Sequence, residues 1–89
     1  NLRLRNSIDF TIWREKIFTL DNYICQKCQG WGGKLQAHHI LNFSNNPSFR
    51  FDLKNGITLC KKCHKNFHDI YSKADNNPNQ MVMFLMGTY

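Results

Sequence analysis

The four cysteines of this chain form two Cys-x-x-Cys pairs, one at residues 25–28 and one at residues 60–63. Two residues between paired cysteines strain a disulfide within the pair but suit thiolates around a tetrahedral zinc ion. Two disulfides in a secreted protein are the alternative use of four cysteines. The spacing favours zinc, and we predict one closed structural site with the sulfur ligands Cys25, Cys28, Cys60 and Cys63. Such a site organises the fold and leaves no open position for a substrate.

The four histidines lie inside this cysteine frame or directly after it. His38 and His39 are adjacent, whereas His64 and His68 are four residues apart, so a helix would place the last two imidazoles on one face, one turn apart. Imidazole binds divalent metal ions, and its neutral form can take a proton from water near pH 7. A single histidine is more often a surface or core residue. Four of them within a zinc frame predict a second, catalytic metal site.

The chain carries an excess of positive charge. Twelve Lys and Arg residues against six Asp and Glu residues give a net charge of +6 and a pI near 9.4, which favours a polyanionic partner. Together with a metal site, this charge narrows the predicted partner to nucleic acid. With 89 residues the chain is one small domain, near the size at which zinc commonly supplements an apolar core.

No segment has the pattern of a signal peptide or a membrane span, since the longest apolar run, at residues 81–86, is far too short. We therefore predict no membrane partner and an intracellular, reducing location. The chain begins with Asn1 rather than Met, which suggests a piece of a longer protein.

Hydrophobic periodicity predicts three helices and two short strands. The predicted elements are helices at 7–21, 61–71 and 79–86 and strands at 35–40 and 56–59. The predicted buried stripes are Phe10, Trp13, Ile17 and Leu20 on the first helix and Cys63, Phe67 and Ile70 on the second. The connection at 42–54 is long and irregular, which indicates a functional loop. If the strands pair, Asn55, which with Gly56 would otherwise indicate a hairpin turn, lies beside His39.

Three segments carry a resemblance to a known family. They are residues 35–40 (Leu-Gln-Ala-His-His-Ile), 51–60 (Phe-Asp-Leu-Lys-Asn-Gly-Ile-Thr-Leu-Cys) and 63–68 (Cys-His-Lys-Asn-Phe-His). This pattern closely resembles the HNH nucleases, and most of all their small phage-encoded and intron-encoded members with a four-cysteine zinc site. The resemblance covers about residues 13–71.

The resemblance implies a small α+β fold, in which a ββα-metal (His-Me finger) core carries a four-cysteine zinc site and flanking helices. Residues 1–89 are then a single HNH nuclease domain. A basic lead-in at 1–6 precedes the core, and a C-terminal cap at 76–89 follows it.

The resemblance also implies a role for each polar residue of the motif. His39 is the general base, and Asn55 holds the loop that aims it. His38 and His64 bind the catalytic divalent ion, while His68 matches a histidine found at the metal or at the phosphate. Many members have Asp where this chain has His38, which leaves the ion open between Mg²⁺ and Mn²⁺, with Ni²⁺, Co²⁺ or Zn²⁺ as alternatives.

Basic residues are predicted to follow the DNA backbone rather than to read bases. Three lysines lie at the start of the 61–71 helix, whose positive dipole end attracts phosphate; an ordinary solvated face is the alternative. The predicted contact residues are Arg50, Lys54, Lys61, Lys62 and Lys65, with Arg3 and Arg5 at the N-terminus. Trp31 is predicted to shield the zinc turn, with stacking at a DNA groove as the alternative.

These features predict a metal-dependent endonuclease that hydrolyses DNA phosphodiester bonds, nicks its substrate and has low intrinsic sequence specificity. The alternative is a non-catalytic, zinc-stapled nucleic-acid-binding module, which would have no use for His39. A zinc-stapled protein-interaction domain is a third reading and leaves the positive charge unexplained. A phage or mobile-element origin, with the cytoplasm of an infected bacterial host as the location, rests on the resemblance alone. The oligomeric state is open between a monomer and a weak dimer.

Overall fold

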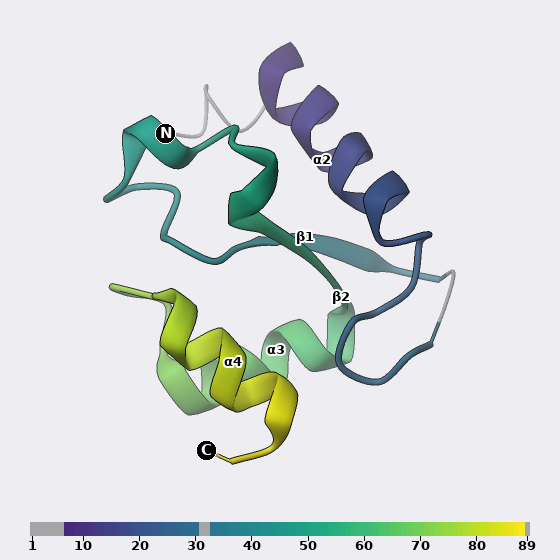
Figure 1. Cartoon of the computed structure of the whole chain (residues 1–89), viewed down its shortest axis with the longest axis vertical. Coiled ribbons are helices and arrows are strands. Elements are labelled where there is room, and N and C mark those ends of the chain that lie inside the picture. The colour runs from purple at the N-terminus through teal and green to yellow at the C-terminus, as the bar shows by residue number, and fades with distance from the viewer. Residues whose placement is uncertain (1–6, 31–32, 89) are drawn as a thin grey trace.

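The computed structural model of this chain describes residues 7–30 and 33–88. Its regular elements are, in order, α2 (Ile8–Leu20), β1 (Leu35–His39), the 3₁₀ turns η1 (Pro47–Phe49) and η2 (Leu53–Asn55), β2 (Gly56–Cys60), α3 (Lys61–Tyr71) and α4 (Pro78–Met86). Figure 1 shows the two strands at the centre, with α2 at one side and α3 and α4 at the other. This is the small α+β arrangement that the sequence predicts.

The two strands form an antiparallel sheet whose register determines which helix each side chain meets. Directly opposed residues of such a pair share a face, and successive residues alternate between faces. His38 lies opposite Ile57, and His39 lies opposite Gly56. The even-numbered residues of β2 face α2, as the hydrogen bond from Thr58 Oγ1 to the Ile17 carbonyl shows. The predicted pairing is therefore confirmed, and the two adjacent histidines point to opposite faces.

Helix α2 covers one face of this sheet. Ser7 caps its first turn by accepting a hydrogen bond from the Phe10 amide. Trp13, Ile17 and Phe18 are buried, whereas Leu20, which the sequence placed on the buried stripe, is 62% exposed. The helix ends there and the chain reverses through positive φ at Asn22 and Tyr23. Leu20 is therefore not held against the sheet, and Phe18 takes its place in the core.

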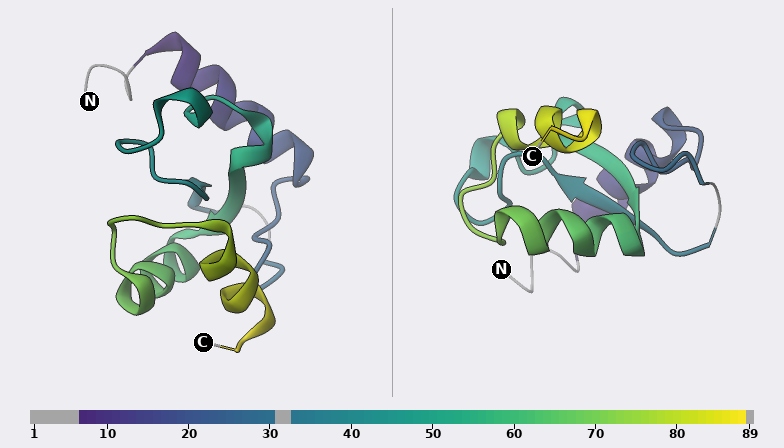
Figure 2. Two further views of the ribbon diagram at one scale, coloured as in Figure 1. Left: turned by 60° about the vertical axis from the view of Figure 1, so that its left-hand side comes forward. Right: turned by 90° about the horizontal axis from the view of Figure 1, so that it is seen from below.

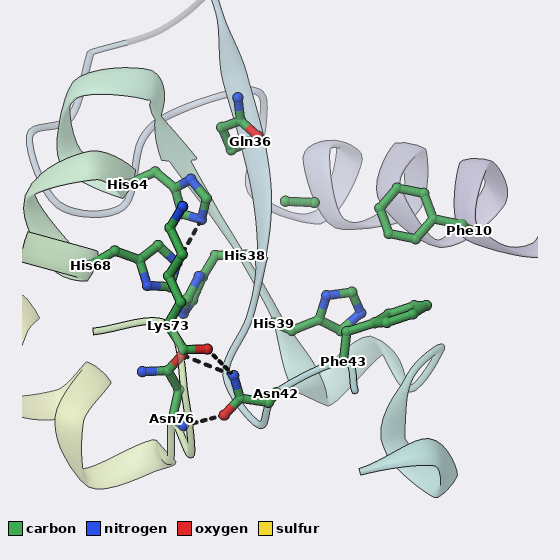
Figure 3. Close-up of a pocket in the computed structure, with 11 residues that line it drawn as sticks. Phe10, Gln36, His38, His39, Asn42, Phe43, His64, His68, Lys73 and Asn76 are labelled. Carbon is green, nitrogen blue, oxygen red and sulfur yellow. Dashed lines mark hydrogen bonds between the residues drawn. The ribbon is translucent and has the colours of Figure 1, made fainter. Parts of the chain in front are cut away.

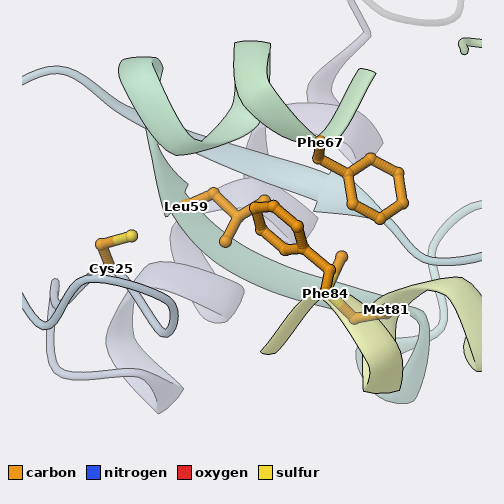
Figure 4. Close-up of a cluster of buried hydrophobic side chains, with 5 residues drawn as sticks. All are labelled: Cys25, Leu59, Phe67, Met81 and Phe84. Carbon is orange, nitrogen blue, oxygen red and sulfur yellow. The ribbon is translucent and has the colours of Figure 1, made fainter. Parts of the chain in front are cut away.

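Helices α3 and α4 cover the other face and enclose the main apolar cluster (Figure 4), which consists of Cys25, Leu59, Phe67, Met81 and Phe84. Figure 2 shows α4 and α3 from two further sides. Ile70, which was predicted to face the core, is 37% exposed, and Tyr71 packs against the cluster instead. Helix α4 begins with a capping box of Asn77 and Gln80 and ends at Gly87, where φ is +74°.

The connection between the strands contains the turns η1 and η2 rather than an entirely irregular chain. It is closed at its base by a hydrogen bond from the Ile40 amide to the Asn55 carbonyl, at 3.2 Å. Among residues 7–30 and 33–88, no helix has the length and apolar character needed to cross a bilayer.

Candidate metal centres and active site

The four cysteines meet at one point, as predicted. Their sulfur atoms all lie within 4.8 Å of one another. In each Cys-x-x-Cys turn the later amide donates to the earlier sulfur, Cys28 N to Cys25 Sγ at 3.5 Å and Cys63 N to Cys60 Sγ at 3.4 Å. Zinc–sulfur bonds of about 2.3 Å in a tetrahedron separate two sulfurs by about 3.8 Å. The 3.8 Å between Cys28 Sγ and Cys60 Sγ matches this separation.

Electrostatics at the cysteines also fits a bound cation. Burial raises the pKa of Cys25, but amide donors from Cys28, Cys60 and Lys27 outweigh it and bring that pKa to about 7. Burial and the neighbouring sulfurs raise the pKa of Cys63. Four thiolates this close repel one another unless a cation neutralises them. The donor set therefore fits a closed structural zinc ion.

A second cluster consists of His38 from β1 and His64 and His68 from α3, whose ring nitrogens also lie within 4.8 Å of one another. Figure 3 shows the three imidazoles converging from the strand and the helix. The Nε2 atoms of His64 and His68 are 3.2 Å apart, close to the separation of about 3.3 Å expected for two imidazoles on one zinc-sized ion. The i, i+4 spacing thus places the His64 and His68 imidazoles on one face of α3, as predicted.

His38 is the buried member of this cluster, with 4% of its surface exposed. Its Nε2 atom has no hydrogen-bond partner among the residues that the structure describes. Burying a polar nitrogen without a partner is costly, and a metal ion would satisfy it. This atom is the strongest structural indication that the histidine cluster is a metal site.

His68 is oriented by the backbone that follows α3. Its Nδ1 lies 2.7 Å from the Ser72 carbonyl oxygen. Since a carbonyl only accepts, Nδ1 carries the proton and the lone pair is on Nε2, which faces the cluster. Metal-binding histidines commonly donate their second nitrogen in this way.

The pKa values of two cluster histidines keep them in the form that binds metal. Burial, followed by the charges of His64, His68 and His39, lowers the pKa of His38 to about 3. Burial, followed by the charges of His68 and Lys73, lowers the pKa of His64 to about 4. Both imidazoles are therefore neutral near pH 7, and neutral imidazole is the ligand form.

His39 lies on the opposite face of β1, outside the metal cluster. Its Nε2 donates to the Arg50 carbonyl at 2.8 Å, so the basic lone pair is on Nδ1. Its ring stacks on Trp13, with centroids 3.9 Å apart and planes 10° from parallel. A cavity of about 260 Å³ is lined by His39 together with the three cluster histidines. The chain thus presents a candidate base and a candidate metal site to one space.

Asn55 closes the loop that carries the Arg50 carbonyl. It is 5% exposed, its Oδ1 accepts from the Leu41 amide at 2.7 Å, and its Nδ2 donates to the carbonyls of Leu41 and Phe49 at 3.1 and 3.0 Å. All of these contacts lie within the connection between the strands. Asn55 is therefore a buried brace of the loop rather than a hairpin-turn residue.

Comparison with known families agrees with this geometry. Residues 23–71, more than half of the chain, match the family model described as HNH endonuclease. The chain belongs to the HNH endonuclease family. It is also 31% identical over 62 residues to Anaredoxin from Nostoc sp. (strain PCC 7120 / SAG 25.82 / UTEX 2576), an alignment that covers 70% of this chain and 79% of that protein. No solved structure matches the chain.

The basic residues expected to contact DNA differ in how far their side chains are already engaged within the protein. Lys61, Lys62 and Lys65 line a groove beside the histidine cavity, although Lys65 also pairs with Asp69 at 2.7 Å. Lys54 is exposed on η2. Arg50 is engaged within the loop, where its Nε and a terminal nitrogen donate to the carbonyls of Phe43 and Ser44. The predictions for Arg3, Arg5 and Trp31 lie outside the described residues.

Sequence reasoning missed two residues of this HNH site. Trp13 was assigned to the core, but it also stacks on His39. The helical periodicity of α2 could not show that the Trp13 ring would meet an imidazole of β1. Lys73 lines both the histidine cavity and the neighbouring groove, yet it stands outside every motif. Only its position four residues after Asp69, just beyond a helix with two histidines, could have drawn attention to it.

Proposed function

We propose that this chain is a metal-dependent endonuclease that hydrolyses DNA phosphodiester bonds. The supporting observation is the division of His38 and His39 between the two faces of β1. His38 faces the imidazoles of α3, His39 faces α2, and both line one cavity. This arrangement holds a base next to a metal site without making the base a metal ligand.

His39 is proposed to activate the attacking water. The water oxygen bonds to phosphorus while its proton moves to Nδ1 of His39, because Nε2 is committed to the Arg50 carbonyl. The bond between phosphorus and O3′ breaks, and the departing oxygen takes a proton from solvent. A divalent ion held by His38, His64 and His68 would supply positive charge at the phosphate and the leaving oxygen; we propose Mg²⁺ or Mn²⁺ in this role.

Asn55 is proposed to act through His39 rather than on the substrate. Its three hydrogen bonds fix the loop that contains Phe49 and, next to it, Arg50. The Arg50 carbonyl in turn sets the tautomer and the plane of the His39 ring. Asn55 is therefore a positioning residue in this proposal.

One such site cleaves one strand, so we propose nicking rather than simultaneous cleavage of both strands. The lysine-lined groove suits contacts to backbone phosphates, which carry no sequence information. We therefore also propose low intrinsic sequence specificity, and a reducing location that preserves the zinc thiolates.

The test is relaxation of a supercoiled plasmid by zinc-loaded protein in Mg²⁺, Mn²⁺, Ni²⁺ or EDTA, beside the His39→Gln variant. Glutamine can still donate to the Arg50 carbonyl but cannot act as a base near pH 7, so this variant should fold and lose nicking. Metal-dependent nicking that the variant lacks supports the proposal. A plasmid that shifts on a gel but is never nicked, with any of these ions, would instead identify a zinc-stapled nucleic-acid-binding module.

A further inference from the structure

Lys73 lies where two cavities meet. It lines the histidine cavity of about 260 Å³, and it also lines the adjoining groove of about 770 Å³. His64, His68 and Gln36 line both spaces as well. A DNA strand that follows the lysines of the groove into the histidine cavity would therefore pass Lys73.

The backbone at Lys73 is held in place by three segments of the chain. Ser72 has φ +64° and ψ −172°, a region that non-glycine residues rarely adopt and that surrounding contacts must enforce. Its carbonyl accepts from His68 Nδ1 at 2.7 Å and from Asn76 Nδ2 at 3.3 Å. The Lys73 carbonyl accepts from Asn42 Nδ2 at 2.8 Å. Lys73 is thus fixed to α3, to the loop after β1 and to the segment that precedes α4.

The Lys73 side chain runs along the histidine cluster, and Figure 3 shows it extending beside His68 toward His64. The ion pairs found in the described part of the chain are Arg14–Glu15 and Lys65–Asp69, so Lys73 has no carboxylate partner among those residues. Its ammonium is therefore not committed to an ion pair in the described part of the chain.

A divalent ion at this cluster and the Lys73 ammonium would repel each other. An anion between them removes the repulsion and attracts both charges. The scissile phosphate is the anion that the proposed function brings to this place. Lys61 and Lys62 line only the groove and not the histidine cavity.

We infer that Lys73 is a further catalytic residue, whose ammonium binds a non-bridging oxygen of the scissile phosphate opposite the divalent ion. This inference rests on the proposed function. It separates Lys73 from Lys61, Lys62 and Lys65, which position the DNA backbone. It also predicts that metal binding and DNA binding strengthen each other. The phosphate offsets the repulsion between the ion and the Lys73 ammonium, and the ion adds positive charge that attracts the phosphate.

The test measures that coupling without cleavage, in the non-cleaving His39→Gln protein. Mn²⁺ affinity is determined by titration calorimetry on zinc-loaded protein, with and without a short DNA duplex. We expect the duplex to strengthen Mn²⁺ binding several-fold. Adding Lys73→Gln should tighten Mn²⁺ binding in the absence of DNA and abolish most of the coupling. Lys16→Gln on α2, which makes the same charge change outside both cavities, is the matched control and should leave both quantities unchanged.

The second measurement uses protein that retains His39. Lys73→Gln should lower kcat by about 10²-fold, the effect of removing one transition-state charge donor, with a smaller change in KM. Coupling that survives Lys73→Gln, or a variant that changes only KM, would overturn the inference. If the unmutated protein never nicks DNA, the proposed function fails, while the Mn²⁺–duplex coupling still decides whether Lys73 lies between ion and phosphate.

Discussion

The indole ring of Trp13 stacks on the imidazole ring of His39, with ring centroids 3.9 Å apart and planes within 10° of parallel. The indole Nε1 donates to the Asp52 carbonyl at 2.9 Å, which fixes the ring plane. Trp13 lies on α2, outside the segment matched by the family model. Helix α2, which lies outside the matched segment, therefore supports one face of the His39 ring. The Arg50 carbonyl accepts a hydrogen bond from Nε2 at the edge of that ring.

Trp13→Phe should keep an aromatic ring under His39 but lose the hydrogen bond to Asp52. We expect a loss of stability of about 1–3 kcal/mol from the lost indole hydrogen bond and the smaller ring. The Asp52 carbonyl itself keeps the hydrogen bond that it accepts from the Asn55 amide at 3.0 Å. We also expect kcat for nicking to fall. The decrease should be smaller than the loss of about 10²–10⁴-fold that removal of a general base causes. DNA affinity, measured by gel shift, should not change. Unaltered kcat in a folded variant would show that the indole hydrogen bond to Asp52 is not needed to orient His39.

Gly56 of β2 packs directly against α2. A Cβ atom there would lie 2.5 Å from Ile17 Cδ1 and 2.7 Å from the Trp13 ring. Gly56→Ala should therefore push α2 away, cost about 1–3 kcal/mol as an overpacked core does, and weaken nicking through displacement of Trp13. The measurements are urea denaturation and plasmid relaxation. Gly30→Ala, where the nearest atom is 3.5 Å away, is the control and should change neither.

Asn55→Asp tests the brace of the loop with almost no change in shape. The substitution removes the two donated hydrogen bonds to Leu41 and Phe49 and places a charge at a position that is 5% exposed. We expect an unfolding free energy lower by about 2–5 kcal/mol at pH 7, and faster exchange of the Leu41 amide. Asn79→Asp makes the same change at an exposed residue in the first turn of α4 and should be neutral or slightly stabilising. Equal stability of the two variants would contradict the assigned role.

Cys60→Ser separates the zinc site from the helix cap. Cys60 both belongs to the sulfur cluster and caps α3 through the Cys63 amide, and serine is itself a good N-cap. The variant should nevertheless be unfolded or aggregated, because zinc binding in comparable small domains contributes about 10–16 kcal/mol to folding. Metal analysis should find one zinc ion per unmutated chain and none in the variant. A zinc-free variant with a native-like thermal transition would refute this expectation.

The stability of the protein should fall on acidification when no ion occupies the histidine cluster. The folded state holds the pKa of His38 at about 3 and that of His64 at about 4, against about 6.5 in an unfolded chain. Between about pH 6.5 and 4 the unfolded chain therefore binds more protons than the folded chain, and the free energy of unfolding decreases as the pH falls.

His64→Gln removes one of these titrating groups, so its stability should depend less steeply on pH over that range. Urea denaturation at several pH values, each with bound zinc measured, checks this expectation. The comparison is valid at those pH values where both proteins retain zinc. Parallel pH profiles of the two proteins would mean that His64 titrates normally in the folded state.

Local patterns were sufficient to predict much of this fold. The α3 helix has the predicted bounds, because its apolar and histidine positions repeat at helical spacing and Cys60 caps it. The first helix and both strands were placed to within a residue or so at each end. Leu20 and Ile70 were assigned to the core wrongly, because Phe18 and Tyr71 pack there in their place. Which side chain near a helix end meets the core is a tertiary property.

The sequence by itself determined the candidate chemistry. It contains two cysteine pairs and a His-x-x-x-His pair, at spacings that local turns and one helix convert into clusters able to hold a metal ion. It also determined that His38 and His39 point to opposite faces if residues 35–40 form a strand, because successive side chains alternate along a strand. Only the tertiary structure decided what stands on each side. Trp13 stacks on His39, and Lys73 runs along the cluster, because α2 packs on one face of the sheet and the chain turns sharply at Ser72 beyond α3. Such contacts join residues distant in sequence, and their spacing leaves no periodic pattern from which they could be read.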